Sequence, residues 1–209
     1  MKILTIGAHP DDIEPQMGGT IAKLTKKGHE VLMLQFTDTG DEISEIRLEE
    51  SINAANILGA KIKHLNYDQS SFKFNRKLVQ TLDNIVEEYK PDDIYSCWEY
   101  DSHQDHQTVS KIVLAASRKN NDNLYFYEPI IPGGVTPYGF QINHFIDISD
   151  TIDIKIKSIE AHKSQVKKFG KAWIDAVYGR ARLRGFQINT EYAEAFQIVK
   201  MINKGREDY

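Results

Sequence analysis

The chain opens on two apolar segments that are separated by a stretch long enough to form a helix. Residues 2–8 read KILTIGA and residues 31–38 read VLMLQFTD, with spaced apolar residues between them and a glycine at Gly28. Two strands joined through a helix are parallel, because a tight hairpin cannot contain the crossover. The pattern therefore predicts a βαβ unit whose helix runs from about residue 19 to residue 27.

The same alternation of strand and helix patterns continues to the end of the chain. It indicates an α/β fold, Rossmann-like, with three α/β/α layers, a mostly parallel sheet and an active site at the carboxyl ends of the strands. We find no repeat or linker, so we expect a single domain over residues 1–209. The remaining strands are predicted at 62–67, 92–99, 124–129, 144–149 and 194–201 (the last as an edge strand), and the remaining helices at 44–58, 75–90, 107–117, 151–169 and 174–184.

The composition excludes several classes of protein. The chain is 41% hydrophobic and 27% charged with a net charge of −4, which gives no sign of nucleic-acid or membrane-surface binding. No run approaches the roughly 18 apolar residues of a membrane span, and the start has no signal-peptide pattern. Cys97 is the only cysteine, so an intrachain disulfide is excluded. We therefore expect a cytoplasmic protein.

A polar cluster follows the first predicted strand directly. It consists of His9, Pro10, Asp11 and Asp12. The glycine patterns of dinucleotide-binding and phosphate-binding loops are absent, and two carboxylates would repel a phosphate. The cluster therefore favours a cation. His9 and Asp12, three residues apart, can face one metal ion from a single turn.

A second polar cluster follows the strand predicted at 92–99, again at a carboxyl end. Residues 100–107 read YDSHQDHQ and offer His103, Asp105 and His106 as a third ligand. Zinc accepts nitrogen and oxygen ligands, and a catalytic zinc typically keeps three protein ligands and a water. The alternative is structural, since the carboxylates could cap the following helices and a lone histidine at a strand end is usually structural.

These motifs resemble the PIG-L/LmbE family of zinc-dependent N-acetylglucosaminyl deacetylases. The resemblance rests on AHPDD followed by GG, on the later HQDH, and on RLEESINAANILGA, FIDIS…KIKSIEAHKSQ and EYAEAF in the family's order. The form AHPDDIE…MGGTIAK is closest to the bacillithiol-type branch. The resemblance implies a hydrolase that removes the N-acetyl group from a GlcNAc-type sugar conjugate, a small molecule, with zinc as the cofactor.

The resemblance also implies the metal ligands and the base. His9, Asp12 and His106 match the family's zinc ligands, and Fe(II) could replace zinc at such a set. Asp11 matches the general base. This role suits amide hydrolysis, because zinc lowers the pKa of bound water to about 7 and a nearby carboxylate can then take its proton.

Three further residues acquire roles from the same resemblance. His103 matches the histidine that stabilises the developing oxyanion or protonates the leaving amine. Asp105 matches the residue that orients a histidine of that pair, as carboxylates beside metal sites do. Arg47 lies where the family often places a substrate-binding arginine. Relatives in this family often form trimers or hexamers, which implies a homo-oligomer here.

Several residues depart from the family pattern or carry weaker signals. Gln104 stands where the family usually has proline, and Pro15 and Gln16 replace small or apolar residues near the expected pocket mouth. Trp98 and Tyr100 could stack on a sugar ring or pack the end of the sheet. A group of basic residues could contact an anionic aglycone, although a solvated helix face is the favoured interpretation: Lys167, Lys168, Lys171, Arg180, Arg182 and Arg184.

Two other functions compete with deacetylation. One is a metal-dependent hydrolase of another amide or of a phosphoester; a di-metal phosphatase would bind two ions per chain. The other is a non-catalytic protein that binds sugars or nucleotides on the same fold. Loss of Asp11 or His103 would favour that function, and both residues are present.

Overall fold

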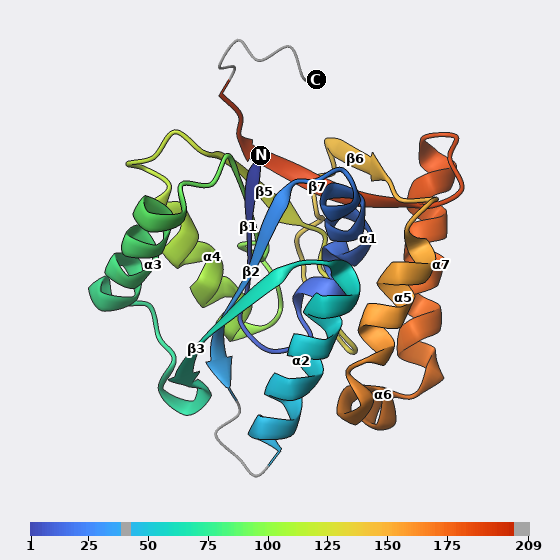
Figure 1. The fold of residues 1–209 in the computed structure, drawn as a ribbon, viewed down its shortest axis with the longest axis horizontal. Helices are drawn as coiled ribbons and strands as arrows, with labels where there is room; N and C mark the ends of the chain where they lie inside the picture. Colours follow the sequence, from blue (N-terminus) through green and yellow to red (C-terminus); the bar gives the residue numbers. More distant parts are fainter. Residues whose placement is uncertain (39–42, 203–209) are drawn as a thin grey trace.

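The structure, a computed structural model, describes residues 1–38 and 43–202. Its centre is a seven-stranded sheet in the order β3-β2-β1-β4-β5-β7-β6 (Figure 1). The strands from β3 to β5 are parallel, whereas β7 is antiparallel to both of its neighbours. The strands are β1 (Lys2–Gly7), β2 (Glu30–Asp38), β3 (Lys61–Asp68), β4 (Asp93–Ser96), β5 (Asn123–Tyr127), β6 (His144–Asp147) and β7 (Ala193–Lys200).

Helices cover both faces of the sheet. Helices α3 and α4 pack together on one face, and α1, α2, α5 and α7 gather on the other (Figure 1). This arrangement confirms the predicted Rossmann-like α/β/α architecture. The helices are α1 (Ile13–Lys26), α2 (Ser44–Leu58), α3 (Arg76–Tyr89), α4 (Gln104–Ala116), α5 (Ile152–Glu160), α6 (Lys163–Phe169) and α7 (Lys171–Gln187), with a 3-10 turn at Gln69–Ser71.

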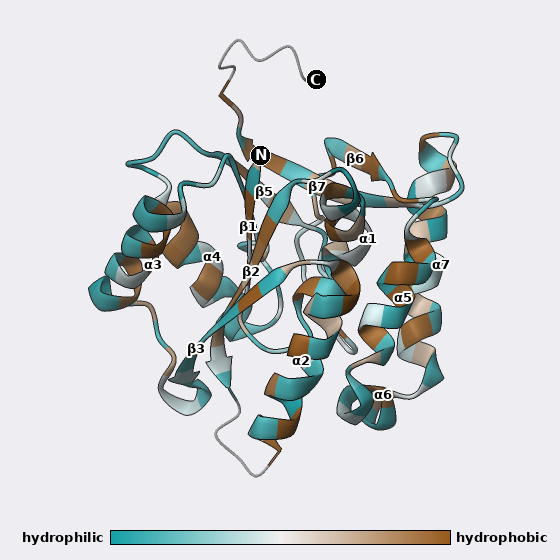
Figure 2. Ribbon diagram, in the orientation of Figure 1, coloured by the Kyte–Doolittle hydropathy of each residue, from teal (hydrophilic) through white to brown (hydrophobic). Residues whose placement is uncertain are grey.

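The hydrophobic core lies along the central strands. All residues of β4 and β5 are buried, and only the first residue of β1 is exposed, as expected for parallel strands covered on both faces. Figure 2 shows hydrophobic residues along these strands and a mixture of hydrophobic and hydrophilic residues on the surrounding helices. Within the described ranges, no helix combines the length and apolar character needed to cross a membrane.

Helix α1 begins earlier than the sequence pattern predicts. It starts at Ile13, not near Gly19, and bends at Met17, whose φ of −142° lies outside helical geometry. The prediction took the glycine pair as the start of the helix. Gly19 instead allows close packing, because a Cβ there would lie 2.6 Å from the Cδ1 atom of Ile148.

The helix predicted over 151–169 is two helices. Between α5 and α6 the chain leaves helical geometry at His162, which has φ −79° and ψ 64°. The break places the His162 ring against the start of α1, where its Nε2 lies 3.0 Å from Oε1 of Glu14 and both side chains are fully buried. The helix predicted at 174–184 is present as α7, which is longer at both ends.

The prediction of an edge strand at 194–201 was wrong. Strand β7 lies between β5 and β6 and pairs with both, so β6 forms that edge of the sheet. Apolar alternation identifies a strand and its buried face, but it does not say which neighbours the strand pairs with.

Cys97 follows β4 and is fully buried, as predicted for a small core residue. Its thiol lies 2.9 Å from the Tyr127 hydroxyl. Burial raises the pKa of Cys97 to about 12, and the approach of neighbouring carboxylates adds to the shift. A thiol with so high a pKa carries little thiolate at neutral pH and is a poor nucleophile.

We therefore expect Cys97 to react with iodoacetamide at pH 8 at least about 100-fold more slowly in the native protein than in 6 M urea, since an unfolded thiol has a pKa of about 8.5. Mass spectrometry of the alkylated fraction against time measures both rates. Equal rates in the two solutions would contradict the buried environment.

Candidate metal centre and active site

Two neighbouring parallel strands bring the polar clusters together. Strands β1 and β4 are paired in register from Ile3 to Ile6, and each is followed at its carboxyl end by one cluster. From β1 the strand order runs through β2 to β3 on one side and from β4 to β5 on the other, so the order of the strands in the sheet reverses between β1 and β4. Such a reversal opens a crevice at the carboxyl ends, where α/β proteins bind their ligands.

Asp12 occupies the centre of the site. The backbone N–H groups of Ala8 and His9 donate to its Oδ2 at 2.8 and 2.7 Å. Its Oδ1 lies 3.1 Å from Nε2 of His106, and its Oδ2 lies 3.4 Å from Nδ1 of His9. Although burial would raise the pKa of Asp12, the two histidines hold it well below its usual range. Asp12 is therefore an ionised, fixed carboxylate.

Each of the two histidines is held by a second carboxylate. His106 Nδ1 lies 2.9 Å from Oδ2 of Asp101, and His9 Nε2 lies 3.0 Å from Oδ2 of Asp105. If each ring donates its N–H to that carboxylate, its other nitrogen presents a lone pair toward Asp12. Carboxylates hold metal-binding histidines in this way, fixing the tautomer and the ring orientation.

The charges of this cluster match a divalent cation. Burial alone would lower the pKa values of the histidines, but Asp12 and the other carboxylates outweigh it, raising that of His9 to about 9 and that of His106 well above the usual range. The lone pairs of His106 Nε2 and Asp12 Oδ1 cannot face each other at 3.1 Å without a proton or a cation between them. Two nitrogens and one carboxylate oxygen suit zinc or Fe(II).

A second donor set overlaps the first. Ligand atoms of His9, His103 and His106 lie within 4.8 Å of one another. However, Nδ1 of His103 accepts the backbone N–H of Asp105 at 3.2 Å and caps α4. The neutral ring then carries its proton on Nε2, and could ligate a metal only by losing that proton. The set with Asp12 fits better, and His103 is left as a hydrogen-bond donor.

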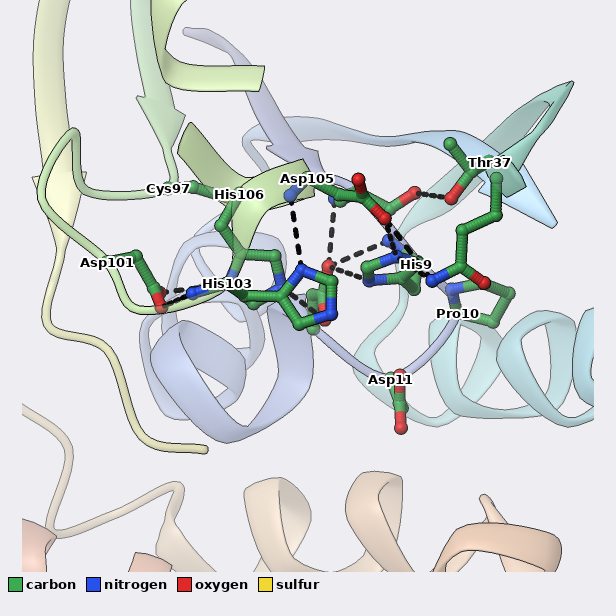
Figure 3. Close-up of polar contacts among 12 residues, drawn as sticks. His9, Pro10, Asp11, Thr37, Cys97, Asp101, His103, Asp105 and His106 are labelled. Carbon is green, nitrogen blue, oxygen red and sulfur yellow. Dashed lines mark hydrogen bonds and ion pairs between the residues drawn. The ribbon is translucent and has the colours of Figure 1, made fainter. Parts of the chain in front are cut away.

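Asp11 has a strained backbone and a paired side chain. Its φ is 101°, which a non-glycine residue rarely adopts. Nη2 of Arg47 donates to its Oδ1 at 2.9 Å and to the carbonyl oxygen of Pro10 at 2.7 Å. Figure 3 shows Asp11 projecting from the loop, away from the histidine rings. Burial raises the pKa of Asp11 to about 6, against the lowering effect of Arg47. A carboxyl with that pKa suits a general base near neutral pH.

A cavity of about 330 Å³ joins these residues to an apolar wall. The polar side holds Asp11, Asp12, Arg47 and the three histidines, and Gln69 donates to Asp105 at 3.2 Å. The apolar side comes from the segment after β5 and from α6 and α7: Ile130, Ile131, Pro132, Phe169 and Trp173. Such a cavity combines an apolar surface with a few convergent polar groups, as small-molecule sites do.

The structure brings together all seven predicted site residues, but it assigns some of them different partners. The carboxylate of Asp105 contacts His9 of the first cluster, while its backbone N–H contacts His103. Arg47 lines the cavity, yet it is bonded to Asp11. Sequence reasoning missed Asp101, which lies outside the HQDH motif, and its position two residues before His103 was the available signal.

The basic residues of the C-terminal helices do not form one solvated face. Arg180 donates to the carbonyl oxygens of Pro129 at 2.7 Å and Pro15 at 3.0 Å, so it joins two segments that border the cavity. Arg184 is paired with Glu128. Lys168 lines the cavity.

With this geometry established, comparison with known proteins identifies the family. The PIG-L family model, GlcNAc-PI de-N-acetylase, matches residues 4–117. The chain belongs to the PIG-L family. It is 28% identical over 221 residues to diacetylchitobiose deacetylase of Thermococcus kodakarensis, a match that covers 95% of this chain and 83% of that protein. It is 31% identical over 172 residues to the uncharacterized deacetylase YaiS of Escherichia coli, with 78% and 90% covered.

A solved structure agrees with this assignment to the PIG-L family. N,N'-diacetylchitobiose deacetylase from Pyrococcus horikoshii, complexed with its inhibitor MPG, superposes with a TM-score of 0.82 at 28% identity and covers 95% of this chain and 83% of that one. These relatives do not test the resemblance to the bacillithiol-type branch, which stays a prediction.

The start of α4 explains how Gln104 can replace the usual proline. Gln104 is the first residue of the helix, a position where proline is favoured because its missing N–H has no helical partner. The preceding His103 is extended, with φ −86° and ψ 122°, as a residue before proline must be. The capping bond at His103 is present with glutamine in place.

We expect Gln104→Pro to raise the free energy of unfolding by about 0.4–1 kcal/mol, because proline restricts the unfolded chain and fits this position. Urea denaturation measures the change. Lys111→Pro, in the exposed middle of the same helix, is the matched control and should destabilise by about 3 kcal/mol. A loss of stability with Gln104→Pro would mean that the glutamine itself supports the helix start.

Proposed function

We propose that this chain is a metal-dependent deacetylase that hydrolyses the N-acetyl group of a GlcNAc-type sugar conjugate. The observation that carries the proposal is the arrangement around Asp12. Two histidines, each held by its own carboxylate, turn their free nitrogens toward Asp12 in a cavity that also contains Asp11 and His103. The names of the relatives, which are deacetylases of acetylated sugars where the substrate is named, support the reaction type.

The proposed ligands are Nδ1 of His9, Oδ1 of Asp12 and Nε2 of His106. When bound, zinc or Fe(II) would supply a Lewis acid for the amide carbonyl and lower the pKa of a water molecule to about 7. Asp101 and Asp105 would hold the two rings in the tautomers that leave these nitrogens free. Within residues 1–38 and 43–202, one such cluster is present, which favours a single-ion hydrolase over a di-metal phosphatase.

Asp11 would take a proton from the attacking water. Its pKa of about 6 leaves it mostly ionised at neutral pH and still basic enough to accept that proton. Arg47 would fix the position of the carboxylate through its contacts with Asp11 and Pro10. As the water oxygen bonds to the acyl carbon, the C–N bond weakens and negative charge develops on the carbonyl oxygen.

His103 would act on the opposite side of the reaction. Its Nε2–H can donate a hydrogen bond to the oxygen that gains charge, and the proton that Asp11 took from the water passes to the nitrogen as the C–N bond breaks. The capping bond from Asp105 keeps the ring in the tautomer that this role requires. The products are the free amine and acetic acid, which carries the water's second proton and loses it to give acetate.

The domain organisation, the cellular location and the oligomeric state are also proposals. We place the activity in one domain over residues 1–209, in the cytoplasm, and on a small-molecule substrate. The family resemblance supports a homo-oligomer, a trimer or a hexamer.

The zinc affinity of single variants distinguishes the ligand set that contains Asp12 from the set that contains His103. We expect Asp12→Asn to weaken zinc binding by at least about 10- to 100-fold, because it removes the charge that both histidines face. His103→Ala should bind zinc within a few-fold of wild type. Competition with a chromophoric chelator gives the affinities, and elemental analysis gives the ions per chain. Loss of zinc in His103→Ala but not in Asp12→Asn would identify the three histidines as the ligands.

Acetate release tests the reaction itself. The zinc-loaded protein is offered GlcNAc, N,N'-diacetylchitobiose, GlcNAc-malate and UDP-GlcNAc, and we expect release from at least one. Asp11→Asn should lower kcat by about 10²- to 10⁴-fold with zinc still bound, because it removes the base. Asp153→Asn, at an exposed position on α5, is the control. No release from any compound by a zinc-loaded protein would refute the proposed substrate class.

A further inference from the structure

An exposed aromatic surface lies beside the candidate active site. The rings of Tyr100 and Tyr138 contact each other, with centroids 4.8 Å apart and an angle of 43° between their planes. They are 46% and 59% exposed. Beneath them Trp98 is buried and makes edge contacts with Tyr100 at 5.6 Å and Phe140 at 5.5 Å. The tyrosine pair is therefore supported from below and open to solvent above.

A second hollow lies between residues next to this pair and the wall of the main cavity. It has a volume of about 160 Å³ and shares two wall residues, Ile130 and Ile131, with the main cavity. Its other walls adjoin the tyrosines: Asp101 follows Tyr100 in the chain, and Thr136 Oγ1 accepts the backbone N–H of Tyr138 at 3.3 Å. The two hollows therefore adjoin at Ile130 and Ile131, and the second lies next to residues that neighbour the aromatic pair.

The chemistry of the second hollow suits a neutral sugar ring. Its described lining offers oxygen atoms from Asp101, Ser102 and Thr136 for hydroxyl groups, and it includes no lysine or arginine. A phosphate or carboxylate there would lack a cationic partner. Aromatic rings pack well on the C–H face of a pyranose, and exposed apolar patches of this kind mark ligand or partner sites.

The size of the main cavity is also in keeping with a second sugar ring bound beside it. At about 330 Å³ it lies near the lower limit for small-molecule sites, so a larger conjugate must extend beyond it. On the wall formed by Ile130 and Ile131 it adjoins the second hollow. Lys168, another lining residue, would suit an anionic group instead. The side with Ile130 and Ile131 has a formed hollow and an aromatic pair nearby.

We infer that Tyr100, Tyr138 and the second hollow form a subsite for a neutral sugar ring next to the ring that is deacetylated. The substrate is then an N-acetylated oligosaccharide of at least two residues. This inference rests on the proposed deacetylase function and specifies its substrate class.

The test compares a substrate with one sugar ring and a substrate with two. For N,N'-diacetylchitobiose we expect Tyr138→Ala and Tyr100→Ala to raise KM by about 3- to 10-fold with kcat little changed, because a stacking contact made equally in the ground and transition states is lost. KM for GlcNAc should not change. Tyr138→Phe keeps the ring and should resemble wild type. Phe186→Ala, which removes an 80% exposed aromatic ring outside both cavities, is the matched control.

A direct measurement of disaccharide binding separates the proposed sugar subsite from the proposed deacetylase activity. Titration calorimetry measures the disaccharide on the zinc-loaded Asp11→Asn variant with and without Tyr138→Ala. Tyrosine-dependent binding without acetate release by the wild-type protein would support the subsite and refute the deacetylase. Acetate release with no effect of either tyrosine would refute the subsite alone. Preference for UDP-GlcNAc, abolished by Lys168→Ala, would overturn it in favour of an anionic group bound at Lys168.

The tyrosine pair could also contact a second copy of the chain. Light scattering on size-exclusion fractions of the wild type and of Tyr100→Ala and Tyr138→Ala decides this. An unchanged mass supports the sugar subsite. A smaller mass in the variants would assign the surface to an interface between subunits and overturn the inference.

Discussion

The carboxylate of Asp12 is the feature on which the rest of the site depends. Two backbone N–H groups of the same loop fix one of its oxygens, which closes the turn after β1 and makes the charge immobile. That fixed charge then determines how His9 and His106 are oriented and protonated. A carboxylate buried among its own partners costs little to ionise, whereas an isolated one would take up a proton. The parallel pairing of β1 and β4 supplies the second half of these partners from a distant part of the chain.

The C-terminal part of the chain supports this centre without contributing to it. The family model ends at residue 117, and all the proposed ligands and catalytic groups precede that point. Beyond it, Glu194 accepts the backbone N–H groups of Gly19 and Thr20, and the paired Lys155 donates to the carbonyl oxygen of Pro15 at 2.9 Å. These buried charges hold the bent first half of α1. The proposed chemistry therefore rests on the first half of the chain, and the second half supplies the apolar wall of the cavity.

The features that were predicted correctly depend on residues that are close in the sequence. The βαβ start and the polar residues at two strand ends follow from periodicity and from sequence order, and the structure places both clusters at one edge. What the sequence did not reveal depends on contacts between distant segments. The break at His162 depends on Glu14, the glycine pair of α1 depends on Ile148, and the place of β7 depends on which strand edges were still free. Asp101 is different, because its partners His103 and His106 are close in sequence; it was missed because it lies outside the HQDH motif.

Arg47 shows how such contacts constrain substrate choice. The strained backbone of Asp11 costs about 1–3 kcal/mol and persists only because its surroundings hold it, and Arg47 does so by bridging Asp11 and Pro10. An arginine whose charge is already paired cannot also neutralise a phosphate or carboxylate of the substrate. Its Nε is buried and has no hydrogen-bond partner among the described residues. The pairing of Arg47 with Asp11 is therefore in keeping with the proposed neutral substrate, as is the lining of the second hollow, which includes no lysine or arginine.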